Sequence, residues 1–126
     1  MPTLSRLTDP MFGSPAVLEV FSDTGTVRRM LDAEAALARA EAQCGVIPAT
    51  AAAVITEVCG RVDVIDLEAL AQAAVSAGNL AIPFVKQLTA AVTQRDADAG
   101  RYVHWGATSQ DIIDTALVLQ LRDALR

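Results

Sequence analysis

The sequence predicts an all-α fold, and three observations support this prediction. Hydrophobic residues make up 52% of the 126 residues and charged residues 20%, a balance typical of an ordered globular protein. Aromatic residues account for only 4% whereas alanine is abundant, which favours close-packed helices over strands. Apolar residues also recur at spacings of three and four, the period of an amphipathic helix.

The first third of the chain predicts a short helix followed by a long one. The Ser-Pro pair at the start of residues 14–21 is typical of a helix N-terminus. Ser22 or Asp23 should cap a longer helix that runs to residue 44. Its apolar stripe consists of Val27, Met30, Leu31, Leu37 and Ala38, and the charged residue Glu34 falls inside that stripe.

Three more helices should follow, separated by recognisable end signals. Gly45 stands where a left-handed residue would end the long helix, and Pro48 can open the next helix, over residues 48–59. Asp66 should cap a helix that ends at Gly78-Asn79. A further helix should start near Ile82-Pro83 and stop in the polar stretch from Arg95 to Gly100.

Thr108 or Ser109 should cap a final helix over residues 110–126. Apolar residues cover most of its circumference, so we expect it to be buried on nearly all sides; they are Ile112, Ile113, Ala116, Leu117, Val118, Leu119 and Leu121. Arg126 lies inside this periodic pattern without a glycine or proline stop signal. We therefore expect a truncated piece of a longer protein; the alternative is a terminal helix that frays.

Composition also limits the classes of partner and site. The net charge is −5 and no basic patch stands out, so we expect no nucleic acid partner. The first 13 residues lack a signal peptide pattern and no apolar run is long enough for a membrane span, which predicts a soluble cytoplasmic protein without a membrane partner. Cys44 and Cys59 are interpreted as reduced packing residues, since their spacing suggests no metal site.

The densest polar segment is residues 104–111, which begins with His104, the only histidine. Thr108 and Ser109 place hydroxyls where the free N–H groups of a helix start also point, an arrangement that suits a carboxylate ligand. The imidazole can add a donor, a charge or a proton relay. The alternative is ordinary helix capping beside a packed surface histidine.

This segment carries a family resemblance. Residues 104–115, HWGATSQDIIDT, resemble the first signature region of the fumarase/aspartase superfamily, in the version typical of its members that act on 3-carboxy-cis,cis-muconate. The same group is matched by DPMFG at 9–13, FSD at 21–23, LARAE at 37–41, GVIP at 45–48 and AGNLAIP at 77–83. The resemblance therefore covers nearly the whole chain.

The resemblance implies an architecture and an assembly. Residues 1–107 would form the N-terminal helical domain, and residues 108–126 would begin a long helix of the central bundle. Superfamily members are homotetramers whose active sites are each assembled from three subunits. No metal ion and no organic cofactor are implied.

By the same resemblance, Thr108 and Ser109 bind a substrate carboxylate and His104 lines the pocket. Gln110 is a further candidate for substrate binding. Asn79 is a candidate polar contact, with a helix C-cap as the alternative interpretation. The principal acid and base belong to signatures that do not occur in residues 1–126.

The implied reaction converts the tricarboxylate 3-carboxy-cis,cis-muconate into a carboxymuconolactone in bacterial protocatechuate degradation. One alternative is another superfamily enzyme such as adenylosuccinate lyase, although residues 76–80 lack the histidine that those enzymes carry there. The other is a helical assembly module without catalysis.

Overall fold

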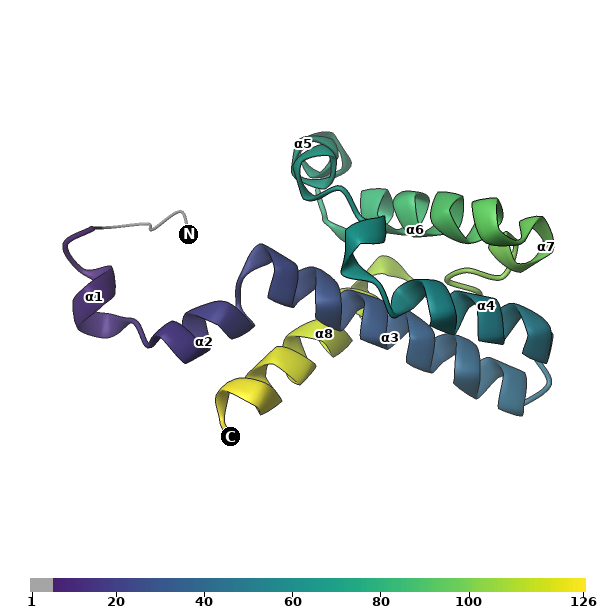
Figure 1. The fold of residues 1–126 in the computed structure, drawn as a ribbon, viewed down its shortest axis with the longest axis horizontal. Coiled ribbons are helices and arrows are strands. Elements are labelled where there is room, and N and C mark those ends of the chain that lie inside the picture. Colours follow the sequence, from purple (N-terminus) through teal and green to yellow (C-terminus); the bar gives the residue numbers. More distant parts are fainter. Residues whose placement is uncertain (1–5) are drawn as a thin grey trace.

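The computed structural model describes residues 6–126, and this part of the chain contains helices but no strand (Figure 1). Its helices are α1 (Asp9–Phe12), α2 (Pro15–Val20), α3 (Asp23–Gln43), α4 (Ala49–Cys59), the 3₁₀ helix η1 (Val62–Val64), α5 (Leu67–Ala77), α6 (Ala81–Arg95), α7 (Ala97–Gly100) and α8 (Ser109–Ala124). The all-α prediction is confirmed.

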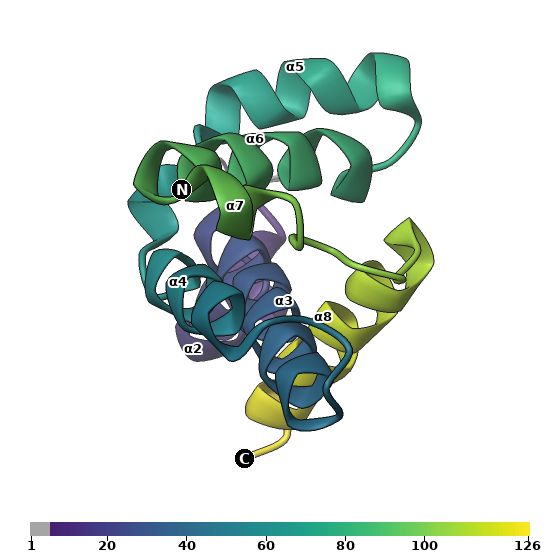
Figure 2. The ribbon, with the colours of Figure 1, turned by 90° about the vertical axis from the view of Figure 1, so that its right-hand side faces the viewer.

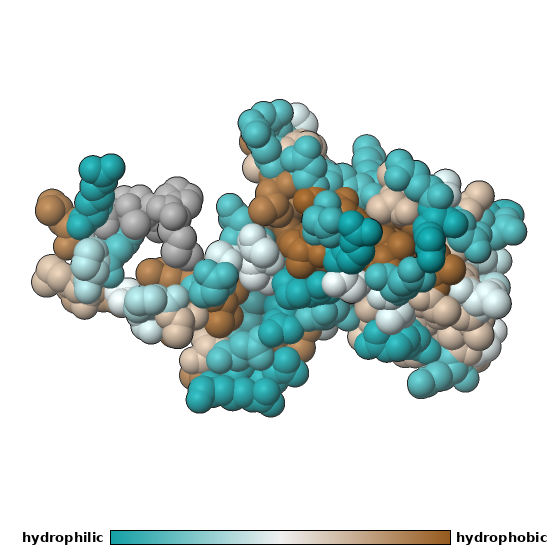
Figure 3. All heavy atoms as spheres, in the orientation of Figure 1, coloured by the Kyte–Doolittle hydropathy of each residue, from teal (hydrophilic) through white to brown (hydrophobic). Residues whose placement is uncertain are grey.

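Helix α3 is the centre of the fold. It packs most extensively against α4 and then against α8, and α6 contacts α4, α5, α7 and α8. In Figure 2, α5 lies outermost, above α6. Helices α1 and α2 extend from the body as an N-terminal arm (Figure 1), and neither helix buries a residue. The apolar side chains of this arm are exposed in Figure 3, Phe12 at 81%.

The core forms around α4, which packs against both α3 and α6. Its large, fully buried apolar side chains are Met30, Leu31, Ile55, Phe84, Leu88 and Val92. Alanines on the facing sides of α3 and α4 are also buried, and such small side chains allow two helix axes to approach closely. The alanine-rich composition therefore serves close helix packing.

The strongest end signals in the sequence act as predicted. The Ser22 hydroxyl accepts a hydrogen bond from the backbone N–H of Gly25 at 3.0 Å, and Asp66 caps α5 in the same way. Gly45 and Gly78 follow α3 and α5 with φ of 72° and 76°. These are left-handed conformations that glycine adopts without a Cβ clash.

Three short helices were not predicted. Helices α1, η1 and α7 contain three or four residues each, too few to show an apolar period. The polar stretch after α6 was interpreted as a plain stop, yet Asp96 caps α7 by accepting hydrogen bonds from two backbone N–H groups. Pro48 also precedes α4 as its N-cap and is not its first residue.

The predicted burial of α8 is wrong for this chain. Only Ile112, Ala116 and Gln120 of α8 are buried. Val118 is 62% exposed, and Leu117 and Leu121 are each 45% exposed. Helix α8 packs mainly against α3, with smaller contacts to α2 and α6, and within residues 6–126 these elements leave much of its apolar circumference exposed. Within this same part, no helix is long and apolar enough to cross a membrane.

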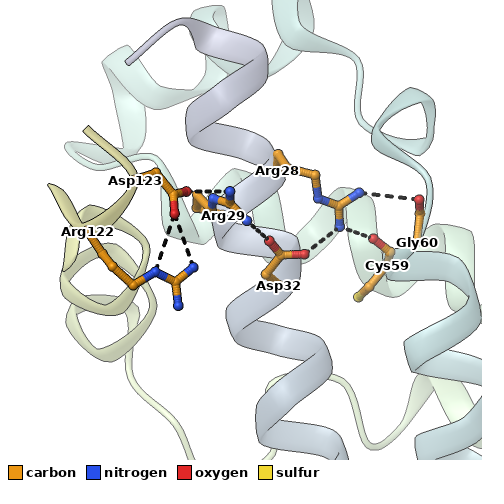
Figure 4. A network of polar contacts seen from close by, with 7 residues as sticks. All are labelled: Arg28, Arg29, Asp32, Cys59, Gly60, Arg122 and Asp123. Atoms are coloured by element: carbon orange, nitrogen blue, oxygen red, sulfur yellow. Dashed lines mark hydrogen bonds and ion pairs between the residues drawn. The ribbon is translucent and has the colours of Figure 1, made fainter. Parts of the chain in front are cut away.

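A polar network fixes α8 and the end of α4 against α3 (Figure 4). Arg29 of α3 contacts Asp32 at 2.7 Å and also pairs with Asp123 near the end of α8. Arg28 contacts Asp32 at 3.0 Å and donates to the carbonyls of Cys59 and Gly60, which close α4. The guanidinium groups thereby connect elements that are far apart in the sequence.

Replacing Phe84 with alanine tests the central packing. Because this side chain is fully buried, Phe84→Ala should lower the free energy of unfolding by about 3–5 kcal/mol. Val75→Ala, at a residue 85% exposed on α5, is the matched control and should change it by less than about 0.5 kcal/mol. Denaturant unfolding measures both, and equal effects would contradict the described core.

Candidate functional site

His104 lies in a strained turn between α7 and α8. Residues 101–106 form consecutive turns, in which His104 has φ 58° and Gly106 has φ 70°. His104 is the only residue other than glycine with positive φ in the described part of the chain. Such a backbone costs of order 1–3 kcal/mol, and strain of this kind persists only where surrounding contacts enforce it.

The His104 side chain contacts Glu34 on α3. Nδ1 of His104 lies 2.6 Å from Oε1 of Glu34, although the residues are 70 positions apart. The Glu34 side chain is 1% exposed and the His104 side chain 15%. Burial raises the pKa of Glu34, while the charge of His104 and its hydrogen bond act in the opposite direction. The second oxygen of Glu34, Oε2, is buried without a partner.

A second carboxyl group of α3 lies near the same turn. Glu41 stands seven residues after Glu34, which places both on one face of the helix. Its Oε1 would be 3.9 Å from a Cβ atom built on Gly106. Burial raises the pKa of Glu41, the charge of His104 lowers it, and its Oε2 is buried without a partner.

A groove runs between α3, this turn and α8. Its volume is about 400 Å³, within the range of small-molecule sites. Small side chains form much of its wall, Leu37, Trp105 and Ile112 supply larger apolar groups, and Glu41 and Asp111 supply carboxyl groups. The Trp105 ring packs against the ring of Tyr102 at a centroid distance of 5.4 Å.

The first turn of α8 combines capping with free donor capacity. Thr108 and Asp111 form a capping box, in which the Thr108 N–H donates to Asp111 Oδ2 at 2.9 Å. Gln110 is engaged along the helix, since its Nε2 donates to Asp114 Oδ1 at 2.7 Å. Ser109 is half-buried, and within residues 6–126 its hydroxyl has no hydrogen-bond partner. Ser109 is therefore the side chain most ready to receive an anion.

Asn79 lies outside this cluster. Its Oδ1 accepts a hydrogen bond from the N–H of Ile82 at 3.0 Å, so it caps the start of α6. The alternative prediction of a C-cap on α5 is wrong, because Gly78 ends that helix. No hydrogen bond among residues 6–126 joins Asn79 to His104 or to the first turn of α8.

Sequence reasoning did not identify Glu34 and Glu41 as site residues. The available signal was Glu34 itself, a charged residue inside an apolar stripe, which requires a buried partner. The cysteines add no chemistry: Cys44 is exposed, so the packing prediction holds only for Cys59. Burial raises the pKa of the Cys59 thiol to about 12, which keeps it protonated. In the described part of the chain, no group of three potential metal ligands occurs.

Known proteins resemble this chain over nearly its whole length. Residues 11–126 match a family model described as Lyase. A 3-carboxy-cis,cis-muconate cycloisomerase of Acinetobacter baylyi is 58% identical over 97% of this chain and 27% of its own length. The same enzyme of Bradyrhizobium diazoefficiens is 57% identical, again over 97% of this chain and 27% of its own length. The chain thus spans about a quarter of these relatives.

A solved structure of such a cycloisomerase is also similar to this chain in three dimensions. The crystal structure of β-carboxy-cis,cis-muconate cycloisomerase from Acinetobacter calcoaceticus has a TM-score of 0.92 and 58% sequence identity. The match covers 95% of this chain and 28% of that one.

The raised pKa of Glu34 predicts a pH-dependent stability. The folded state binds the Glu34 proton more tightly than the unfolded state, whose pKa is near 4.5. The stabilisation from this proton is therefore fully present below pH 4.5 and lost as pH rises through the raised pKa of Glu34. Glu34→Gln should remove this pH dependence. As pH rises from 4.5 through the raised pKa of Glu34, the unfolding free energy of wild type should therefore fall relative to that of the variant.

Denaturant unfolding from pH 4 upward measures this difference. Glu57→Gln, at an exposed residue of α4, is the control and should keep the wild-type pH dependence. A Glu34→Gln curve parallel to wild type at every pH would contradict the proton assignment.

Proposed function

This chain belongs to the lyase family, and from that membership we propose that it is the N-terminal part of an enzyme that converts 3-carboxy-cis,cis-muconate into a carboxymuconolactone. The observation that carries the proposal is 58% and 57% identity to two cycloisomerases of different genera over 97% of the chain. The TM-score of 0.92 to a solved cycloisomerase supports it.

The proposed reaction is an intramolecular addition. One carboxylate oxygen of the substrate forms a bond to a carbon of a C=C double bond, and a proton enters at the neighbouring carbon. The substrate trianion takes up this one proton and becomes a lactone dianion, so that substrate and product are isomers when both are written as the fully protonated acids. No metal or organic cofactor is required. The protein must hold a tricarboxylate trianion in a reactive conformation and stabilise the charge that develops.

The first turn of α8 would bind one substrate carboxylate. The free Ser109 hydroxyl, the N–H groups of the first turn and the positive end of the helix act together on an anion there. Thr108 and His104 would add a hydroxyl and an imidazole nitrogen. Gln110 would need to release Asp114 to contribute. Asn79 remains a proposed polar contact from the start of α6.

Glu41 also affects this binding. A carboxylate beside the groove would repel a trianion, and the raised pKa of Glu41 favours its neutral form.

The domain division and the assembly are proposed on the same basis. Residues 1–107 would form the N-terminal domain and residues 108–126 the start of the central bundle. The exposed apolar side chains of Leu117, Val118 and Leu121 support this, because a bundle would cover them. We further propose a cytoplasmic homotetramer with shared active sites, acting in protocatechuate degradation. Its principal acid and base would belong to other parts of the enzyme.

The purified full-length enzyme tests the proposal in an assay of 3-carboxy-cis,cis-muconate consumption, followed by loss of the diene absorbance. We expect conversion to the lactone. Turnover of a succinyl-amine substrate instead would favour another lyase, such as adenylosuccinate lyase. If the enzyme shows neither of these activities, an assembly module built around the exposed face of α8 would be favoured.

Replacing Ser109 tests the carboxylate site. Ser109→Ala in the full-length enzyme should raise the KM for 3-carboxy-cis,cis-muconate roughly tenfold, because a hydrogen bond to a charged group is lost. Ser76→Ala, on the exposed surface of α5, is the matched control and should leave KM unchanged. Unchanged affinity and turnover in Ser109→Ala would exclude a carboxylate role for this hydroxyl.

A further inference from the structure

Glu34 is the one acidic side chain in the buried stripe of α3. Carboxyl groups are almost never fully buried unless they are paired. All of its pairing is with His104: Oε1 lies 2.6 Å from Nδ1, and a hydrogen bond from the His104 backbone also lowers the pKa of Glu34. Packing alone would be served better by an apolar residue, so this carboxyl group points to a function directed at the imidazole.

The contact engages only one ring nitrogen of His104. Within residues 6–126, Nε2 has no hydrogen-bond partner and is not among the buried unpartnered polar atoms, so it remains accessible. In histidine, the hydrogen bond made by one ring nitrogen determines whether the other is a donor or an acceptor. Glu34 is therefore positioned to set the hydrogen-bonding role of the accessible nitrogen.

We infer that Glu34 is a positioning residue for His104: it shares one proton with Nδ1 across their contact and thereby keeps a second proton on Nε2, which donates to a substrate carboxylate. This assignment rests on the proposed function. With both protons present the buried pair is neutral, whichever of Oε1 and Nδ1 holds the shared one. Loss of one proton leaves Glu34 ionised, Nδ1 protonated and Nε2 with a lone pair, which repels a carboxylate.

The surroundings favour the neutral pair. The ionisable groups that interact with Glu34, besides His104, are Glu41 on the same helix and Cys59 on α4. Burial raises the pKa of Glu34, the Coulombic effect of Glu41 raises it further, and the Cys59 thiol remains protonated. Neither group is a cation, and the interactions that lower the pKa of Glu34 all come from His104.

The left-handed backbone of His104 is an independent observation. A φ of 58° at a residue other than glycine is strained, and the contact with Glu34 is the only side-chain hydrogen bond that His104 makes within residues 6–126. Left-handed conformations of residues other than glycine cluster at functional sites.

The test uses the full-length enzyme and the KM for 3-carboxy-cis,cis-muconate from pH 5 upward, through the raised pKa of Glu34. In wild type, KM should rise about tenfold per pH unit once the pair loses its proton, with kcat changing less. Glu34→Gln is nearly isosteric but cannot lose a proton, so its KM should not follow that rise. Glu34→Ala should raise KM roughly tenfold at every pH, because the imidazole is no longer held. Glu57→Gln is the control and should reproduce the wild-type profile.

A second readout does not depend on activity. The ¹⁵N chemical shifts of His104, assigned by their loss in His104→Gln, report which ring nitrogen carries the proton. We expect a proton on Nε2 in wild type and a different pH response in Glu34→Gln. If wild type does not convert the muconate but the shifts respond as expected, the proposed function fails and the Glu34 assignment stands.

Two results would overturn the assignment itself. One is a Glu34→Gln enzyme that retains the wild-type pH dependence of KM and the wild-type ¹⁵N shifts. The other is a Glu34→Ala enzyme with unchanged KM that only melts at a lower temperature, which would show that Glu34 serves stability alone.

Discussion

The candidate site depends on the buried contact between Glu34 and His104. It joins the middle of α3 to the turn that precedes α8, across 70 positions of sequence. A buried carboxyl group with one unpaired oxygen is costly, and so is a left-handed histidine. The packing of α4 against both α3 and α6 must offset both costs, and the fully buried Met30, Leu31 and Phe84 belong to that core.

The same helix also sets where α8 begins. Ile112 and Ala116 of α8 are buried, and Arg29 pairs with Asp123 at the other end of the helix. Near that end, Gln120 donates to the Val20 carbonyl at 2.9 Å and to Thr26 at 3.0 Å. Contacts at both ends fix the position of α8 along α3, so the free N–H groups of its first turn have a defined position relative to His104.

Local signals in the sequence predicted most helix ends but not the interactions between helices. A cap or a left-handed glycine acts within four residues, so Ser22, Asp66 and Gly78 are recognisable from sequence. The pairing of Glu34 with His104 depends on how α3 meets a distant turn, which no local pattern specifies. For α8, the apolar circumference was recognised correctly, but covering it needs elements other than those in residues 6–126.

The charge balance of the groove indicates what the rest of the proposed enzyme must provide. The residues that line it include the acidic Glu41 and Asp111 and no lysine or arginine. A helix N-terminus contributes the equivalent of about half a positive charge, and a protonated Nε2 adds one donor. These suffice for one carboxylate but not for a trianion, whose other two carboxylates also need compensating charge or donors. Under the proposed function, cationic side chains must therefore approach the groove from other parts of the enzyme, which is the arrangement that an active site shared between subunits provides.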